Sequence, residues 1–229
     1  MKTVGIIGGL GPETTAKFYL EVIRLCLDKD QSHRPPILIW SVPLPYQIEK
    51  EAIIQAKGEE RNIPDLIEAA KKLEKSGADF LVMPCNTLHI FIEEIRKAVS
   101  IPVLSIIEET VNFFKNKNVK RVGLLATSIT INHNLYSRKL SENGIKEIIP
   151  DQKEQINLNQ IIHRIVMNRY SDKDKKTLDD IIDNFSKKGL KIIILACTDL
   201  QILVSNHSDI EIYDTMEILA EATVQKIIS

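Results

Sequence analysis

Apolar residues along the chain gather in short runs that alternate with longer stretches of helical spacing. The runs are continuous, which is typical of strands covered on both faces of a parallel sheet. They predict strands at residues 3–8, 36–42, 79–84, 102–106, 121–126, 147–151, 191–196 and 211–214. Between them, helical spacing predicts helices at 13–29, 61–76, 87–99, 132–143, 155–168, 177–188 and 215–228. This alternation predicts a three-layer α/β fold.

The two halves of the chain resemble each other. Val4 begins the run VGIIGG and Val122 begins VGLLAT. A cysteine follows each run at a similar distance, Cys85 in one half and Cys197 in the other, and each precedes a helix-length segment and another strand. A repeat of this length predicts two pseudo-symmetric α/β/α lobes, each with a mainly parallel sheet, and a cleft between them. We place the lobes at residues 1–110 and 111–213, with a final helix at 214–229 that packs back on the first lobe.

Cys85 and Cys197 both end an apolar run at a strand-to-helix turn. Parallel sheets bind ligands beyond the carboxyl ends of their strands. A helix N-terminus there lowers the pKa of a thiol from its usual value of about 8.5. Either cysteine alone is also explained as a small buried residue. Their matched positions in the two halves favour a chemical pair on opposite sides of one cleft.

Two opposed acid/base groups suit the removal of a proton from one face of a carbon and its return on the other face. The product then has the inverted configuration. Asn86, Thr87 and Thr198, together with backbone N–H groups at the turns, can hold a substrate carboxylate. The same side chains could instead cap the helices that follow.

The glycine-rich run GIIGGLGPETT differs from a dinucleotide-binding loop, because Thr14 stands where a third glycine is needed. We interpret the run as a tight turn that brings Leu10 and neighbouring N–H groups to the cleft. Thr127 and Thr130 occupy the corresponding segment of the second half. The five histidines are scattered and predict no metal site.

Composition narrows the class of partner. Lys and Arg number 30 and Asp and Glu 31, so the net charge of -1 offers no basic field for nucleic acid. No apolar stretch approaches the ~20 residues that cross a bilayer. Three cysteines far apart form no disulfide framework, and a cytoplasmic protein is expected. Cys26 lies in a helical pattern and is expected in the core.

The motifs GIIGGLGPETT, GADFLVMPCNTLH, IPVLSIIEET, VGLLATSIT and LACTDL closely resemble the cofactor-independent aspartate/glutamate racemase family, almost from end to end. The resemblance implies a racemase without cofactor that uses Cys85 and Cys197 as its acid/base pair. It also implies an amino-acid substrate, expected to be acidic, and a homodimer. Residues that match the substrate-contacting motifs of the family are Asn86, Thr87, Thr127, Thr130 and Thr198.

Two departures bear on substrate choice. Family members usually have Gly-Cys-Thr-Glu where this chain has Ala-Cys-Thr-Asp, ending at Asp199. Aspartate-specific members also carry an arginine in a region that here is LPYQIEKEAIIQAKGEE, with Lys50 nearest to that position. The segment around Gln55 is similar to the broad-specificity branch of the family, which makes Gln55 a candidate substrate contact.

Two alternatives stay open from the sequence. One is a related enzyme of the same superfamily that isomerises or decarboxylates a dicarboxylate. The other is a non-catalytic protein that binds a small molecule in the cleft, which unreactive thiols would favour.

Overall fold

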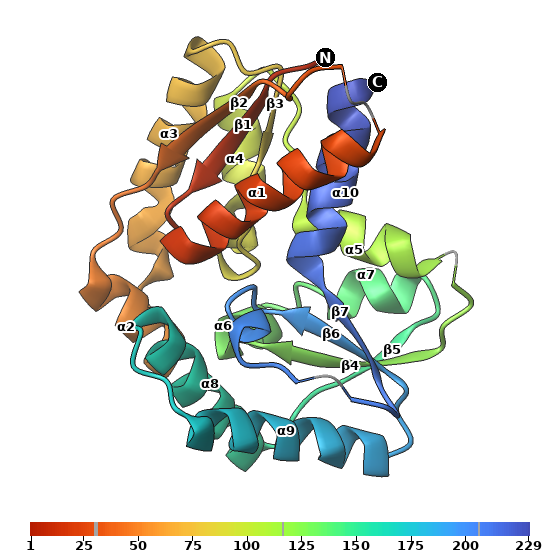
Figure 1. Cartoon of the computed structure of the whole chain (residues 1–229). Helices are drawn as coiled ribbons and strands as arrows, with labels where there is room; N and C mark the ends of the chain where they lie inside the picture. Colours follow the sequence, from red (N-terminus) through yellow and green to blue (C-terminus); the bar gives the residue numbers. More distant parts are fainter. Residues whose placement is uncertain (30–31, 116, 206) are drawn as a thin grey trace.

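The computed structural model describes residues 1–29, 32–115, 117–205 and 207–229. Its strands form two sheets, ordered β2-β1-β3 and β5-β4-β6-β7, in which every pairing is parallel (Figure 1). The strands are β1 (Val4–Gly8), β2 (Ile37–Ser41), β3 (Phe80–Val82), β4 (Arg121–Ala126), β5 (Lys146–Ile148), β6 (Ile192–Ala196) and β7 (Glu211–Asp214).

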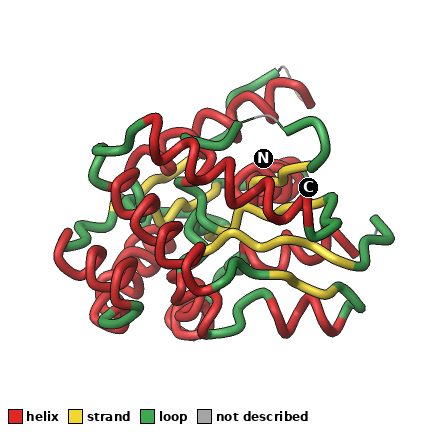
Figure 2. Tube along the Cα trace, turned by 90° about the horizontal axis from the view of Figure 1, so that it is seen from below, coloured by secondary structure: helices red, strands yellow, loops and turns green. Residues whose placement is uncertain are grey.

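Helices lie on both faces of the strands (Figure 2). The α-helices are α1 (Pro12–Lys29), α2 (Tyr46–Gln55), α3 (Ile63–Lys75), α4 (Ile92–Ala98), α5 (Ile106–Lys115), α6 (Ser128–Asn132), α7 (Ser137–Glu142), α8 (Gln152–Val166), α9 (Asp172–Lys187) and α10 (Thr215–Ile228). Short 3₁₀ helices are η1 (Glu59–Asn62), η2 (Thr87–Phe91) and η3 (Leu200–Ile202).

The repeat seen in the sequence is a repeat of topology. In each sheet the strand that opens the half (β1 or β4) is flanked by the next strand and by the strand that leads to the cysteine. Val103 forms a parallel bridge with Leu81, at the place that β7 takes beside β6. The two halves therefore form pseudo-symmetric α/β lobes, and the predicted fold class is confirmed.

Several predicted elements need correction. The strand expected at 102–106 is reduced to the single bridge at Val103, because α5 already begins at Ile106. The helix expected at 132–143 is two helices, α6 and α7, because the backbone turns left-handed at Asn134 (φ 53°). Helix α2 was not predicted, since Pro43 and Pro45 obscure its start.

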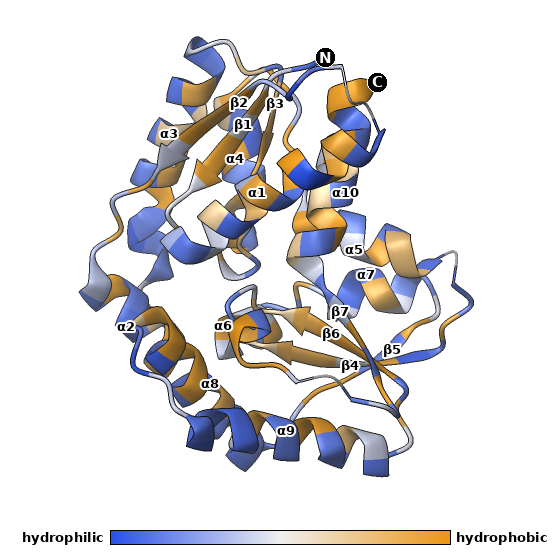
Figure 3. Cartoon of the chain, viewed as in Figure 1, coloured by the Kyte–Doolittle hydropathy of each residue, from blue (hydrophilic) through white to orange (hydrophobic). Residues whose placement is uncertain are grey.

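Side chains of the first sheet alternate between two packed layers, as the period of a strand requires. Val4 and Ile6 of β1 face α1 and α10, whereas Ile7 faces α3. In the second sheet, Leu124 of β4 joins the core of Val4 and Ile6, and Leu125 faces α8 and α9. One core thus lies between the two sheets. In Figure 3 the inner strands are apolar, and α9 carries polar residues.

The C-terminal helix α10 packs against α1 and α5. The two ends of the chain lie close together (Figure 1). The Lys2 N–H donates to the Ile227 carbonyl at 2.8 Å. Within the described residues, none of the helices combines the length and apolar character needed to span a bilayer.

Candidate active site

A cavity of about 60 Å³ lies between the lobes. The turns that follow β1, β3, β4 and β6 line one side of it, and α2, η1 and α8 line the other. The predicted site residues that line it are Leu10, Cys85, Asn86, Thr87, Thr127, Cys197 and Thr198.

The two cysteine turns have the same local geometry. The backbone N–H groups of Thr87 and Leu88 donate to the Cys85 sulfur. Those of Asp199 and Leu200, at the same two offsets, donate to the Cys197 sulfur. Each sulfur therefore sits in a small pocket of backbone donors that stabilises a thiolate.

Both thiols are nevertheless held in their protonated form. Burial raises the pKa of Cys85 to about 12, and the carboxyls of Asp199 and Glu49 add to this effect. Burial and the Asp199 carboxylate raise the pKa of Cys197 well above its usual value. The lowered pKa values expected from the sequence are wrong for the protein without substrate. The turns continue into short 3₁₀ helices, and their two N–H donors do not offset desolvation.

Each cysteine turn is joined to the opposite lobe through the side chain two positions after the cysteine. The Thr87 hydroxyl hydrogen-bonds the Thr127 hydroxyl at 2.9 Å. On the other side, the Thr14 hydroxyl donates to the Asp199 carboxylate at 2.7 Å. Thr87 and Asp199 are thus equivalent by position, but one is neutral and the other is acidic.

Thr130 lies behind the cavity lining. Its hydroxyl is 3.1 Å from that of Thr127 and 3.5 Å from that of Thr87, and its backbone N–H donates to the Thr127 hydroxyl, which caps α6. The three threonines form one hydroxyl cluster, in which Thr130 supports the two that line the cavity.

Two buried hydrogen-bond partners hold the Asn86 side chain in place. The Tyr136 hydroxyl donates to its Oδ1 at 2.5 Å, and its Nδ2 donates to the Thr215 hydroxyl at 3.0 Å. Thr215 in turn donates to the carbonyl of Leu195, just before Cys197. This chain of hydrogen bonds connects the strand end before Cys197 to the residue after Cys85.

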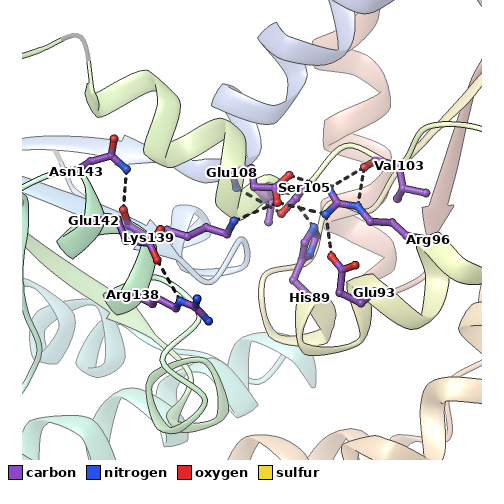
Figure 4. Close-up of polar contacts among 11 residues, drawn as sticks. His89, Glu93, Arg96, Val103, Ser105, Glu108, Arg138, Lys139, Glu142 and Asn143 are labelled. Carbon is purple, nitrogen blue, oxygen red and sulfur yellow. Dashed lines mark hydrogen bonds and ion pairs between the residues drawn. The ribbon is translucent and has the colours of Figure 1, made fainter.

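His89 supports the Cys85 turn from the other side. Its Nδ1 hydrogen-bonds the carbonyl of Cys85, and its Nε2 accepts from the N–H of Ile106 at 3.1 Å. An accepting Nε2 requires a neutral ring, and burial accordingly lowers the pKa of His89 to about 4. The nearby Glu108 binds both Arg96 (2.7 Å) and Lys139 of α7 (3.2 Å), as Figure 4 shows.

The remaining predicted residues differ in placement. Leu10 is buried in the turn after β1, where Gly9 (φ 81°) leaves no room for a side chain against the backbone of Val42. Thr198 is buried at the cavity wall. The Gln55 side chain is exposed at the end of α2 and does not line the cavity, whereas Ala52 and Ile53 of the same helix do.

Three polar residues of the cavity wall were not singled out as site residues from the sequence. Glu49 comes from α2, Asn62 from η1 and Asp199 from the Cys197 turn. Only Asp199 carried a signal, as a departure from the family motif. Glu49 and Asn62 reach the wall because α2 and η1 fold over the cleft against α8 and α3, a tertiary placement without a sequence pattern.

Among the residues that the structure describes, no group of three or more His, Cys, Asp or Glu is placed to hold a metal ion.

Comparisons with known proteins agree with this geometry. The family model described as Asp/Glu/hydantoin racemase matches residues 7–223. The chain is 32% identical over 226 residues to the broad specificity amino-acid racemase RacX of Bacillus subtilis (strain 168), covering 96% of each protein. An aspartate racemase of Picrophilus torridus superposes with a TM-score of 0.81 at 28% identity, covering 99% of this chain and 94% of that one. An aspartate racemase homologue of Pyrococcus horikoshii OT3 gives 0.79 at 28% identity, covering all of both chains.

Proposed function

Because the chain belongs to the Asp/Glu/hydantoin racemase family, we propose that it is an amino-acid racemase that moves the α-proton between Cys85 and Cys197. The observation that carries the proposal is that both cysteines, from equivalent strand ends of the two lobes, line the same cavity. Each has the same pair of backbone donors at its sulfur.

The proposed step balances as a proton exchange. The thiolate of one cysteine takes the α-proton, the C–H bond breaks, and its electron pair delocalises into the substrate carboxylate. The thiol of the other cysteine then donates its proton to the opposite face of the carbon. The second sulfur becomes the thiolate, and the configuration is inverted. The return reaction uses the two groups in exchanged roles.

The substrate itself helps to form the first thiolate. An amino acid brings an α-ammonium group into the cavity, and a nearby positive charge favours the charged form of a thiol. This lowers the thiol pKa values that burial holds high in the substrate-free protein. The hydroxyls of Thr87, Thr127 and Thr198 at the cavity wall are available to orient the substrate carboxylate.

Cofactor independence belongs to the same proposal. Pyridoxal phosphate enzymes hold their cofactor as a Schiff base with a lysine, and no lysine is found among the described residues that line the cavity. The cysteine pair supplies both the base and the acid that the reaction needs. The cytoplasmic location and the homodimer both stay predictions. Size-exclusion chromatography with light scattering would test the oligomeric state.

The experiment is α-proton exchange in deuterated water over a panel of L- and D-amino acids, without added cofactor, in wild-type protein and in Cys85→Ala and Cys197→Ala variants. Wild-type protein should invert and exchange both enantiomers. Each variant should lose inversion by about 10²–10⁴-fold, the usual contribution of a general acid or base.

The two variants should differ in which enantiomer still exchanges, because each retains the base on one face only. Cys26→Ala serves as the control, since Cys26 is buried in the core between the two sheets. Inversion at the wild-type rate in both active-site variants would disprove the two-cysteine mechanism. Thermal melting of each variant verifies that it is folded.

A further inference from the structure

We propose that Glu49, Asn62 and Asp199 form a subsite for a positively charged substrate side chain, so that the protein prefers long basic amino acids such as lysine or ornithine. This rests on the proposed racemase function of the same cavity. It differs from the acidic substrate that the family resemblance implies.

The three residues give the cavity wall an excess of hydrogen-bond acceptors. Glu49 is half-buried, and its carboxylate has no ion pair with any described residue. Asn62 is 3% exposed, and its side-chain oxygen has no hydrogen-bond partner in the described part of the protein. A buried polar atom without a partner costs about 1–3 kcal/mol, so a ligand that donates a hydrogen bond there is favoured.

Charge favours the same kind of ligand. No Lys or Arg is found among the described lining residues of the cavity. The charged groups that act on Glu49 are themselves acidic, namely Asp199 and Glu13, and together with burial they raise the pKa of Glu49 to about 7. The nearby Arg61 is already paired with Glu51. An ammonium group at this position would neutralise a site that otherwise carries only carboxylates.

The shape of the wall fits a long aliphatic stem. Ala52, Ile53 and Val166 line the cavity beside Glu49 and offer apolar contacts to methylene groups. Beyond them, a second cavity shares Glu49, Val166 and Asp199 with the first. A substrate held by its α-carbon at the cysteines would direct its side chain along these apolar residues towards the two carboxylates that both cavities share.

An acidic side chain meets the opposite situation. Its carboxylate would face Glu49 and Asp199 without a basic partner in the described wall, and like charges in a partly desolvated site repel. A neutral side chain of the same length would fill the apolar part but leave the acceptors unpaired. The structure thus orders the three classes as basic, neutral and acidic.

The test compares lysine, norleucine and glutamate as substrates, since norleucine has the lysine stem without the ammonium group. In wild-type protein, kcat/KM for lysine should exceed that for norleucine at least about tenfold, the size of one charge-assisted hydrogen bond. In Glu49→Gln the value for lysine should fall about tenfold, mostly through KM, while that for norleucine stays within about twofold.

Glu60→Gln is the matched control, because Glu60 is an exposed glutamate of η1 outside the cavity lining and should leave all three substrates unchanged. A wild-type preference for glutamate, or an equal loss for lysine and norleucine in Glu49→Gln, would overturn the subsite. Isothermal titration calorimetry with lysine and with norleucine measures binding without turnover, and so separates the subsite proposal from the racemase proposal. If no amino acid is racemised but lysine binds more tightly than norleucine in a Glu49-dependent manner, the subsite stands and the racemase function fails.

Discussion

The two cysteine turns share one backbone design and differ in their charges. In both, the N–H groups two and three positions after the cysteine donate to its sulfur. In the first turn the side chain two positions on is Thr87, which meets another hydroxyl across the cleft. In the second it is Asp199, whose carboxylate accepts from Thr14 and raises the pKa of both thiols.

This difference makes the two thiols unequal before any substrate binds. The thiol of Cys197 has the carboxylate on its own turn, and burial and Asp199 are the two largest causes of its raised pKa. For Cys85, the backbone N–H of Leu88 lowers the thiol pKa by more than the Asp199 carboxylate raises it. Topological symmetry places the two sulfurs, whereas single side chains set how readily each gives up its proton.

The largest expected effect is on the pH dependence of the free energy of unfolding. It comes from the residue four positions after each cysteine, which is His89 in one turn and Gln201 in the other. Burial lowers the pKa of His89 from its usual 6.5 to about 4 in the folded protein. As pH falls below 6.5, the unfolded chain binds a proton that the folded protein does not. The free energy of unfolding therefore falls between pH 6.5 and 4, by about 3 kcal/mol from this group.

His89→Gln makes the first turn like the second and removes this titration. Urea unfolding at pH 7, 5.5 and 4 should show a smaller loss of stability in the variant than in the wild type. His33→Gln, at an exposed position, should keep the wild-type slope. If the stability of the His89 variant and of the wild type depended on pH in the same way, His89 would not be a neutral ring hydrogen-bonded to the Cys85 carbonyl.

A smaller effect is expected from Asp199→Asn, which removes the acidic charge that distinguishes the second turn. Without that charge the pKa values of both thiols fall, so more thiolate is present at a given pH. The rate of alkylation by iodoacetamide at fixed pH should rise about tenfold, with the pH profile moved to lower values. Mass spectrometry assigns the label to each cysteine.

In the wild type, Cys85 should be labelled before Cys197, and in Asp199→Asn the two rates should become more alike. Asp209→Asn, at an exposed aspartate outside the cavity lining, is the control. An unchanged order and rate of labelling in Asp199→Asn would mean that the carboxylate does not set the difference.

The smallest expected effect is the difference in unfolding free energy between the two hydrogen bonds that join the lobes, Thr87 to Thr127 and Thr14 to Asp199. Thr87→Val removes a hydroxyl pair and should cost about 1 kcal/mol, the net value of a neutral hydrogen bond. Thr14→Val removes a donor to a carboxylate and should cost about 2 kcal/mol at pH 8, where that carboxylate is charged. Guanidinium unfolding measures both. Equal costs would show that the charge of Asp199 adds nothing to the contact.

The sequence predicted the parts of the site that the repeat determines. Cys85, Asn86 and Thr87 follow one apolar run, and Cys197 and Thr198 follow the equivalent run, so parallel-strand topology alone brings them to one cleft. Periodicity also located most strands and helices, since their apolar faces are buried in continuous cores.

The side of the cavity away from the cysteines could not be predicted in this way. Glu49 lies on α2, which corresponds in chain order to α8 of the second half, and Asn62 lies on η1. Both reach the cavity through the packing of these elements against α8 and α3. Gln55 was chosen from sequence similarity, but the turn of the helix directs it to solvent. The raised thiol pKa values likewise depend on burial, which local sequence does not report.

The single core between the two sheets has a consequence for how the molecule moves and unfolds. Val4 and Ile6 of the first lobe and Val122 and Leu124 of the second belong to one apolar cluster, which α10 completes. Opening the lobes as separate bodies would expose that cluster to water, at about 25 cal/mol per Å² of apolar surface. Substrate entry must therefore depend on local movement of the segments at the cavity mouth, and the two halves should melt together as one cooperative unit.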